Sequence, residues 1–271
     1  MEITLLGSGE AVGVPAPLCG CTYCQESGRR RRPGLLIENE DTTVVIDIGP
    51  EIKEQLHRTD TTEVDAFFLT HHHFDHVGGL HELAHAAMGL DRHVGNGEDF
   101  DPAEKPHDPE FAVYLSEGCL EHLHESTPHL ESTLDLRTLA HGDAVSVGDL
   151  TVTPFPIEHA RPEFDTLGFA IECDGRAVVY APDMWEFMSE REPDRVYADA
   201  DLLFAEGAAL FRTFGHGDEN DLRAALADAN ADRTVLLNLN EHLQRMTTAE
   251  LRDAAQADGY ELGVDFATYE L

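Results

Sequence analysis

Hydrophobic residues recur along this chain in short runs that predict β-strands, separated by polar turns and by segments with helical spacing. Residues 2–7, 34–38 and 43–47 are apolar runs of strand length. The last two flank a polar turn at residues 39–42, so we expect a β-hairpin there. Residues 64–69 predict a further buried strand.

The rest of the chain continues this mixture of strands and helices. Further strands are predicted at residues 111–115, 144–153, 166–181 (the last two as hairpin pairs), 201–207, 233–238 and 263–271. Helices are predicted at residues 76–88, 116–124 and 219–230, and a last helix follows the capping box of Thr247 and Glu250. No Ser/Gly-rich linker interrupts the pattern, so we expect one α/β domain over residues 1–271. Residues 89–110 lack periodicity and predict an acidic insertion that could serve as a lid.

Four metal-binding side chains follow the strand at residues 64–69 within six positions. His71, His73, Asp75 and His76 lie on the loop between that strand and the next helix. A loop can direct alternate side chains to two sides, so the two first histidines can reach one metal while Asp75 and His76 reach a second. Imidazole and carboxylate together suit zinc, manganese or iron. The alternative is a histidine-rich surface loop, which the strand-end position and the Asp make the weaker interpretation.

Two later strand ends carry the residue types that this first motif lacks. His159 follows one predicted strand and Asp183 follows another. They offer a third imidazole for one metal and a carboxylate able to bridge two metals. Either residue alone would be interpreted as an ordinary loop residue.

Three of the five cysteines form a separate cluster. Cys19, Cys21 and Cys24 can hold one tetrahedral zinc if a fourth ligand comes from elsewhere in the chain. A reduced surface cluster is the alternative. An odd number of cysteines does not indicate a disulfide scaffold.

The charge balance is extreme, with 53 acidic against 18 basic residues and a net charge of −35. Such self-repulsion is screened at molar salt, so we infer a halophile's protein. An acidic disordered protein is the alternative, but the acids are spread among strand patterns. The charge also opposes broad attraction of nucleic acid. The basic run Arg29-Arg30-Arg31-Arg32 stands out as a candidate phosphate contact.

The chain gives no sign of membrane association. No apolar run approaches the roughly 20 residues that span a bilayer, and the first residues lack the basic region of a signal peptide. We therefore expect a cytoplasmic protein without a membrane partner. A homodimer is left open.

The pattern His71-x-His73-x-Asp75-His76 resembles the signature of the metallo-β-lactamase-fold hydrolases. With the early Gly-x-Gly loop and the Cys-x-Cys-x-x-Cys, it is most similar to their phosphodiesterase branch, in particular the phosphoribosyl 1,2-cyclic phosphate phosphodiesterases, and more distantly to ribonuclease Z. The resemblance implies an αββα four-layer sandwich of two mixed sheets. It implies that His71, His73 and His159 hold one metal, that Asp75 and His76 hold the other, and that Asp183 bridges them.

The resemblance also implies a structural zinc on Cys19, Cys21, Cys24 and His242, and a catalytic role for His216, although the spacing after His216 is longer here. One departure concerns the family's His-x-x-His, which reads Leu239-Asn240-Glu241-His242 in this chain. We therefore expect weaker occupancy of the second metal site, with water, Asn238 or Asn240 replacing the missing histidine.

These residues predict a hydrolase that holds two divalent metals, zinc or manganese, besides the structural zinc. Metal-activated hydroxide would cleave a small phosphodiester, with Asp75, Asp183 and His216 as catalytic residues. RNA is the alternative substrate, as in ribonuclease Z. Further alternatives are a thioester or lactone hydrolase and a metal-binding protein with impaired catalysis.

Overall fold

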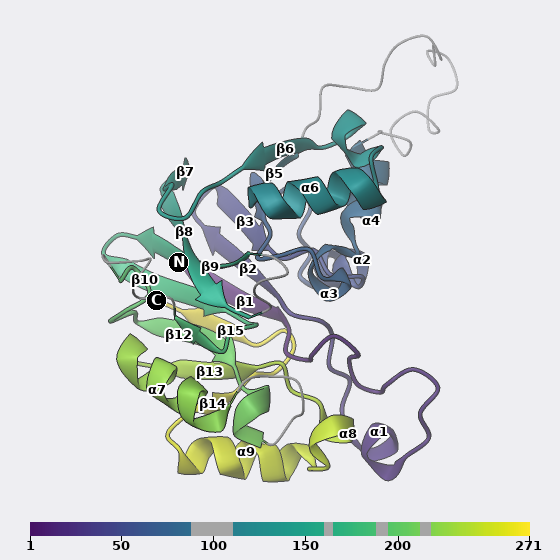
Figure 1. Ribbon diagram of the computed structural model, residues 1–271, viewed down its shortest axis with the longest axis vertical. Helices are drawn as coiled ribbons and strands as arrows, with labels where there is room; N and C mark the ends of the chain where they lie inside the picture. The colour runs from purple at the N-terminus through teal and green to yellow at the C-terminus, as the bar shows by residue number, and fades with distance from the viewer. Residues whose placement is uncertain (88–110, 160–164, 188–194, 212–217) are drawn as a thin grey trace.

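Two β-sheets pack face to face with helices on both outer sides (Figure 1). The computed structural model describes residues 1–87, 111–159, 165–187, 195–211 and 218–271. Among these residues, no helix combines the length and the apolar character needed to cross a membrane.

The first sheet has seven strands in the order β15-β1-β2-β3-β4-β5-β6. Its strands β1 to β3 pair antiparallel, and β3 to β6 pair parallel. The bounds are β1 (Glu2–Gly7), β2 (Gly34–Asn39), β3 (Thr42–Ile46), β4 (Ala66–Phe68), β5 (Ala112–Leu115), β6 (Asp135–Thr138) and β15 (Thr268–Glu270).

The second sheet has eight strands, in the order β11-β8-β9-β10-β12-β13-β14 with β7 beside β8. It is antiparallel from β11 to β10 and parallel from β10 to β14. The bounds are β7 (Val145–Val147), β8 (Leu150–Glu158), β9 (Thr166–Cys173), β10 (Arg176–Ala181), β11 (Glu186–Phe187), β12 (Leu202–Glu206), β13 (Thr234–Leu237) and β14 (Glu261–Leu262). Both sheets are mixed, as expected.

The helices cover the two outer faces. The first sheet is covered by α2 (Ile52–Arg58), α4 (Leu80–Ala87) and α6 (Glu117–Ser126), and the second by η2 (Ala208–Phe211), α7 (Glu219–Ala229) and α9 (Thr248–Ala257). The short helices α1 (Thr22–Glu26), α3 (Phe74–Val77), η1 (Leu130–Ser132) and α8 (Glu241–Gln244) lie in connections.

Alternation of side chains along the strands builds this layering. In β3, Val44 and Ile46 join the apolar cluster between the sheets, whereas Val45 joins the cluster under α2, α4 and α6. All three residues are fully buried. Because successive side chains of a strand point to opposite faces, one short apolar run serves two layers. The predicted αββα sandwich is confirmed.

Two sequence predictions differ from the structure. The helix expected at residues 76–88 is two helices, α3 and α4, separated at Gly78 and Gly79. A Cβ at Gly79 would lie 2.3 Å from the Gly49 carbonyl oxygen, so this close approach requires glycine and shapes the loop. Of the last strand expected at residues 263–271, only β15 at Thr268–Glu270 is a strand, and β14 lies just before this range in the other sheet.

Candidate metal centres

The loop after β4 is organised by a buried carboxylate, Asp47, at the end of the neighbouring strand β3. Asp47 accepts hydrogen bonds from the Thr70 backbone N–H and from Thr70 Oγ1, both at 2.9 Å. Its Oδ2 lies 2.7 Å from His76 Nδ1. A second bond on Nδ1 fixes the imidazole ring and directs its Nε2 elsewhere, which is how carboxylates orient metal-binding histidines.

Three histidines form the first ligand group. His71, His73 and His159 each place a ring nitrogen within 4.8 Å of the others. His71 Nε2 and His73 Nδ1 are 2.9 Å apart. Burial lowers the pKa of both rings, and neighbouring histidines lower it further. The neutral imidazole that results is the form that binds metals.

The second group brings His76 and Asp183 together with His71. His76 Nε2 lies 2.9 Å from Asp183 Oδ2 and 3.2 Å from Asp75 Oδ2. Burial opposes a charge on His76, but the carboxylates of Asp47, Asp75 and Asp183 raise its pKa well above the ordinary value. Burial likewise would raise the pKa of Asp183, yet His76 holds it well below the ordinary range.

This second group passes a simple test of fit for a metal. His76 Nε2 and Asp183 Oδ2 are both buried and face each other at 2.9 Å, but among the described residues neither forms a hydrogen bond of good geometry. Buried polar atoms without partners are rare in native structures. An imidazole nitrogen and carboxylate oxygens facing one another are a donor set that zinc or manganese accepts.

Asn238, at the end of β13, is the residue that lies beside Asp183. Its Nδ2 donates to Asp183 Oδ1 at 2.9 Å, to Glu206 Oε2 at 2.9 Å and to the Pro182 carbonyl at 2.7 Å. Three acceptors fix which end of the amide is nitrogen. Its Oδ1 is buried and has no hydrogen-bonding partner among the described residues.

The two residues that follow Asn238 have other structural roles. Leu239 is fully buried in the apolar cluster under α7 and α9. Asn240 caps α8 by accepting from the backbone of His242 and Leu243, and its Nδ2 donates to Glu10. Of the two asparagines expected to replace the missing histidine, only Asn238 therefore contacts a residue of the metal groups.

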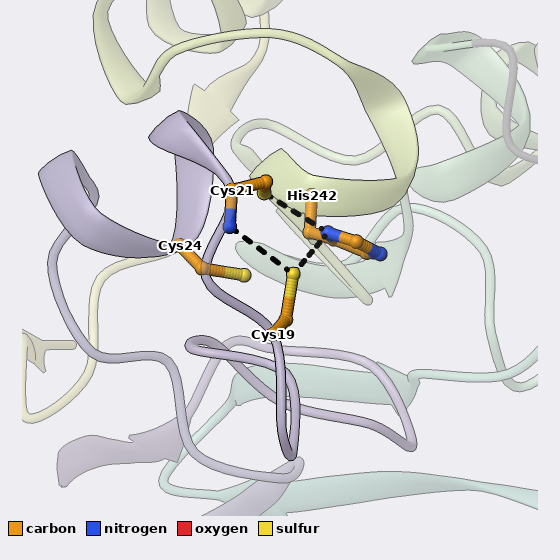
Figure 2. A group of neighbouring side chains, drawn as sticks. All are labelled: Cys19, Cys21, Cys24 and His242. Atoms are coloured by element: carbon orange, nitrogen blue, oxygen red, sulfur yellow. Dashed lines mark hydrogen bonds between the residues drawn. The ribbon is translucent and has the colours of Figure 1, made fainter.

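The cysteine cluster lies beside α8 (Figure 2). His242 Nδ1 lies 3.3 Å from Cys19 Sγ and 3.2 Å from Cys21 Sγ, and Cys24 completes the group. A hydrogen bond from the Cys24 backbone and one with His242 lower the pKa of Cys21 to about 6. Three sulfurs and one imidazole within 4.8 Å match the donors of a structural zinc.

Two predicted features lie outside the described residues. These are the candidate catalytic residue His216 and the insertion at residues 89–110. Within the described part, a pocket of about 420 Å³ borders His73 and is lined mainly by apolar side chains and histidines of α3, α4 and α6. His72 stacks on His122 there with ring centroids 3.9 Å apart.

Sequence reasoning named most of the clustered residues but gave Thr70 and Glu206 no role in the site. Thr70 Oγ1 lies 3.0 Å from His71 Nδ1 and 3.2 Å from His76 Nδ1. Glu206 is fully buried and accepts from Asn238. Their positions were the available signal, because Thr70 directly precedes the ligand His71 and Glu206 is the last residue of strand β12.

Known proteins resemble this chain in sequence over different lengths. A 257-residue alignment with an octanoyltransferase of Porphyromonas gingivalis has 30% identity and covers 89% of this chain and 46% of that protein. A ribonuclease Z of Methanopyrus kandleri is 32% identical over 146 residues, or 50% of this chain and 43% of that protein. The chain thus spans less than half the length of these two relatives.

Solved structures share the fold over the whole chain. The Zn²⁺-bound PqqB of Methylobacterium extorquens superposes with a TM-score of 0.76 at 20% identity, with all of both chains covered. A diphosphatase of the PhnP family gives 0.75 at 21% identity, covering 100% of this chain and 97% of that one. The family model described as Beta-lactamase superfamily domain matches residues 42–237, more than half of the chain. The chain therefore belongs to the β-lactamase superfamily of metallo-β-lactamase-fold proteins.

Proposed function

We propose that this protein is a metal-dependent hydrolase that cleaves a small phosphodiester. The observation that carries the proposal is the position of Asp183, which belongs to the second ligand group and also faces His159 of the first. Its Oδ2 lies 2.9 Å from His76 Nε2, and its Oδ1 lies 4.0 Å from His159 Nε2. One carboxylate that faces both groups suits a two-metal centre, the arrangement used by many phosphodiesterases.

Each ligand group would hold one of the two metals. His71, His73 and His159 would hold one divalent metal, while Asp75 and His76 would hold the other and Asp183 would contact both. Two such ions, when bound, lower the pKa of a shared water and stabilise the charge on a phosphoryl group. Asp47 and Asn238 keep His76 and Asp183 in position. His216 is proposed to donate the proton that the leaving alkoxide needs.

The pocket beside His73 supports a small substrate. Its volume of about 420 Å³ falls in the range of small-molecule sites. Leu80, Leu123 and Leu130 contribute an apolar wall, so the leaving group would be of nucleoside or sugar size with an apolar face. Such a group would be oriented there while its phosphate lies at the metal centre.

An RNA substrate is the second candidate, favoured by the similarity to ribonuclease Z. A net charge of −35 opposes it, because RNA binding depends on basic side chains that neutralise phosphates. We do not propose octanoyl transfer, although one relative is an octanoyltransferase, because this chain covers only 46% of that protein. Thioester or lactone hydrolysis and a purely metal-binding role remain alternatives for the assay to separate.

The test is cleavage of bis(p-nitrophenyl) phosphate by the full chain with added Zn²⁺ or Mn²⁺, beside a phosphomonoester, a thioester and a lactone. We expect diester cleavage that His73→Ala and Asp183→Ala reduce to the background rate. His85→Ala, on the exposed face of α4, is the matched control and should keep full activity. Retained activity in the first two variants, or cleavage of only the thioester or lactone, would refute the proposal.

A further inference from the structure

A small pocket on another part of the molecule collects basic side chains. Arg29, Arg30, Arg31, Arg58 and Arg252 line a cavity of about 340 Å³. The whole chain has only 18 basic residues against 53 acidic ones. None of the residues that line this arginine pocket belongs to the three ligand groups.

Three of the five arginines are already paired with carboxylates. Arg30 is buried and binds both oxygens of Glu241, at 2.9 and 3.1 Å. Arg31 contacts Asp265 at 3.2 Å and also pairs with Glu54. Arg29 contacts Glu54 at 3.0 Å. Three carboxylates thus balance three guanidinium groups.

The other two arginines form no ion pair in the described part of the chain. Within the described ranges, no carboxylate lies within 4.0 Å of Arg58 or Arg252. Arg58 instead stacks over the Phe266 ring, with its guanidinium carbon 4.1 Å from the ring centroid. This contact orients the guanidinium at low entropic cost without neutralising it.

A buried donor in the same pocket has no partner. Arg31 is 4% exposed, and its Nε has no hydrogen-bonding partner among the described residues. A buried N–H without an acceptor costs stability, more so on a charged group. The pocket is therefore lined by two arginines without an ion pair, and a third, Arg31, keeps one buried donor without a partner.

We propose that the arginine pocket binds a phosphate dianion, either free orthophosphate or the terminal phosphate of a phosphomonoester. Two guanidinium groups that form no ion pair match a dianion, and guanidinium groups bind phosphate through paired N–H donors. The small volume and the acidic remainder of the chain argue against a nucleic-acid backbone. This site goes beyond the proposed hydrolysis and does not depend on it.

The experiment is calorimetric titration of the metal-loaded full chain with orthophosphate and with a phosphomonoester at constant ionic strength. We expect that Arg58→Gln combined with Arg252→Gln weakens the pocket's binding at least about tenfold. Diester cleavage should stay unchanged, since neither residue belongs to the ligand groups. Arg252→Gln alone, an exposed change, gives a second variant with intact packing. Preference for one titrant would distinguish free phosphate from the phosphomonoester as the ligand.

Two controls separate this site from the metal centre and from general charge. Arg176→Gln combined with Arg223→Gln makes the same change in net charge at positions outside the pocket and should leave phosphate binding intact. Asp183→Ala should also keep the pocket's binding. Equal weakening by the control pair, unchanged binding in the pocket variants, or loss of all phosphate binding in Asp183→Ala would overturn the proposal.

Discussion

A single amide, that of Asn238, connects the second ligand group to the interior of the second sheet. Its Nδ2 donates to Asp183 Oδ1, to the buried Glu206 and to the Pro182 carbonyl, so three acceptors share its two hydrogens. Removing a hydrogen-bonding partner of a metal ligand typically lowers metal affinity 10–100-fold. Asn238 is thus a positioning residue, whose effect reaches the metal through Asp183.

We predict that Asn238→Leu weakens binding of the second metal about 10- to 100-fold. Competition with a chelator, followed by a metal-sensitive dye, measures this affinity directly and does not depend on turnover. Asn220→Leu, on the exposed start of α7, is the control. Parent-like affinity in Asn238→Leu would show that Asp183 needs no such support.

Placing the family's histidine at position 239 should not restore a metal ligand. Its side chain is fully buried among apolar residues under α7 and α9. A histidine there would lose water contacts without reaching the metal groups. We predict that Leu239→His lowers the free energy of unfolding, measured in denaturant, and does not raise metal content. A gain of one metal per chain would contradict this placement.

At the scale of elements, helix α8 connects the cysteine cluster to the rest of the fold. It carries His242 toward the cysteines and Glu241 toward Arg30. Arg30 also donates to Ser8 Oγ and to the Gly263 carbonyl, and Thr248 donates to Glu241. Both charges are buried, at 6% and 1% exposure, so each depends on the other.

Breaking this pair should be costly. Glu241→Gln leaves the Arg30 charge buried without a carboxylate, and we expect a loss of about 3–5 kcal/mol in the free energy of unfolding. Arg29→Gln removes an exposed pair and should cost less than about 1 kcal/mol. Denaturant unfolding of the two variants compares them. Equal losses would mean that burial of the Arg30 pair is unimportant.

The sequence predicted elements well where burial alone determines them. The hairpin of β2 and β3, strands β12 and β13, and the capping box of α9 were all found from local pattern. Prediction from the sequence failed where a contact with a distant part of the chain determines the structure. The break at Gly79 depends on Gly49, and the split of β14 from β15 depends on which sheet accepts each strand.

The residues of the candidate site likewise divide into those that the sequence predicts and those that it does not. The histidine motif identifies itself by spacing, and His242 was placed with the cysteines through the family resemblance. Sequence reasoning named Asn238 as a possible replacement ligand, but its hydrogen bonds to Asp183 and Glu206 could not be predicted, because its three acceptors come from β12 and from the loop after β10. The same is true of the arginine pocket, which gathers Arg58 and Arg252 from separate helices.

At the scale of the whole molecule, charge is the dominant property. A net charge of −35 produces repulsion that is screened within roughly 10 Å at 0.1 M salt but within roughly 3 Å at 1 M. We predict that the thermal unfolding midpoint rises between 0.1 and 2 M KCl. On α6, Glu121→Gln combined with Glu125→Gln removes a like-charge pair four residues apart and should stabilise the chain only at low salt. A midpoint independent of salt would contradict this account.

Metal content per chain tests the central claim most directly. It would be measured by elemental analysis of protein purified in high salt without added metal, for the parent and for His242→Ala and Asp183→Ala. We predict about three metals in the parent, with one zinc lost in His242→Ala and active-site metal lost in Asp183→Ala. A parent that holds only the cysteine-bound zinc, even after incubation with Zn²⁺ or Mn²⁺, would contradict the two-metal centre.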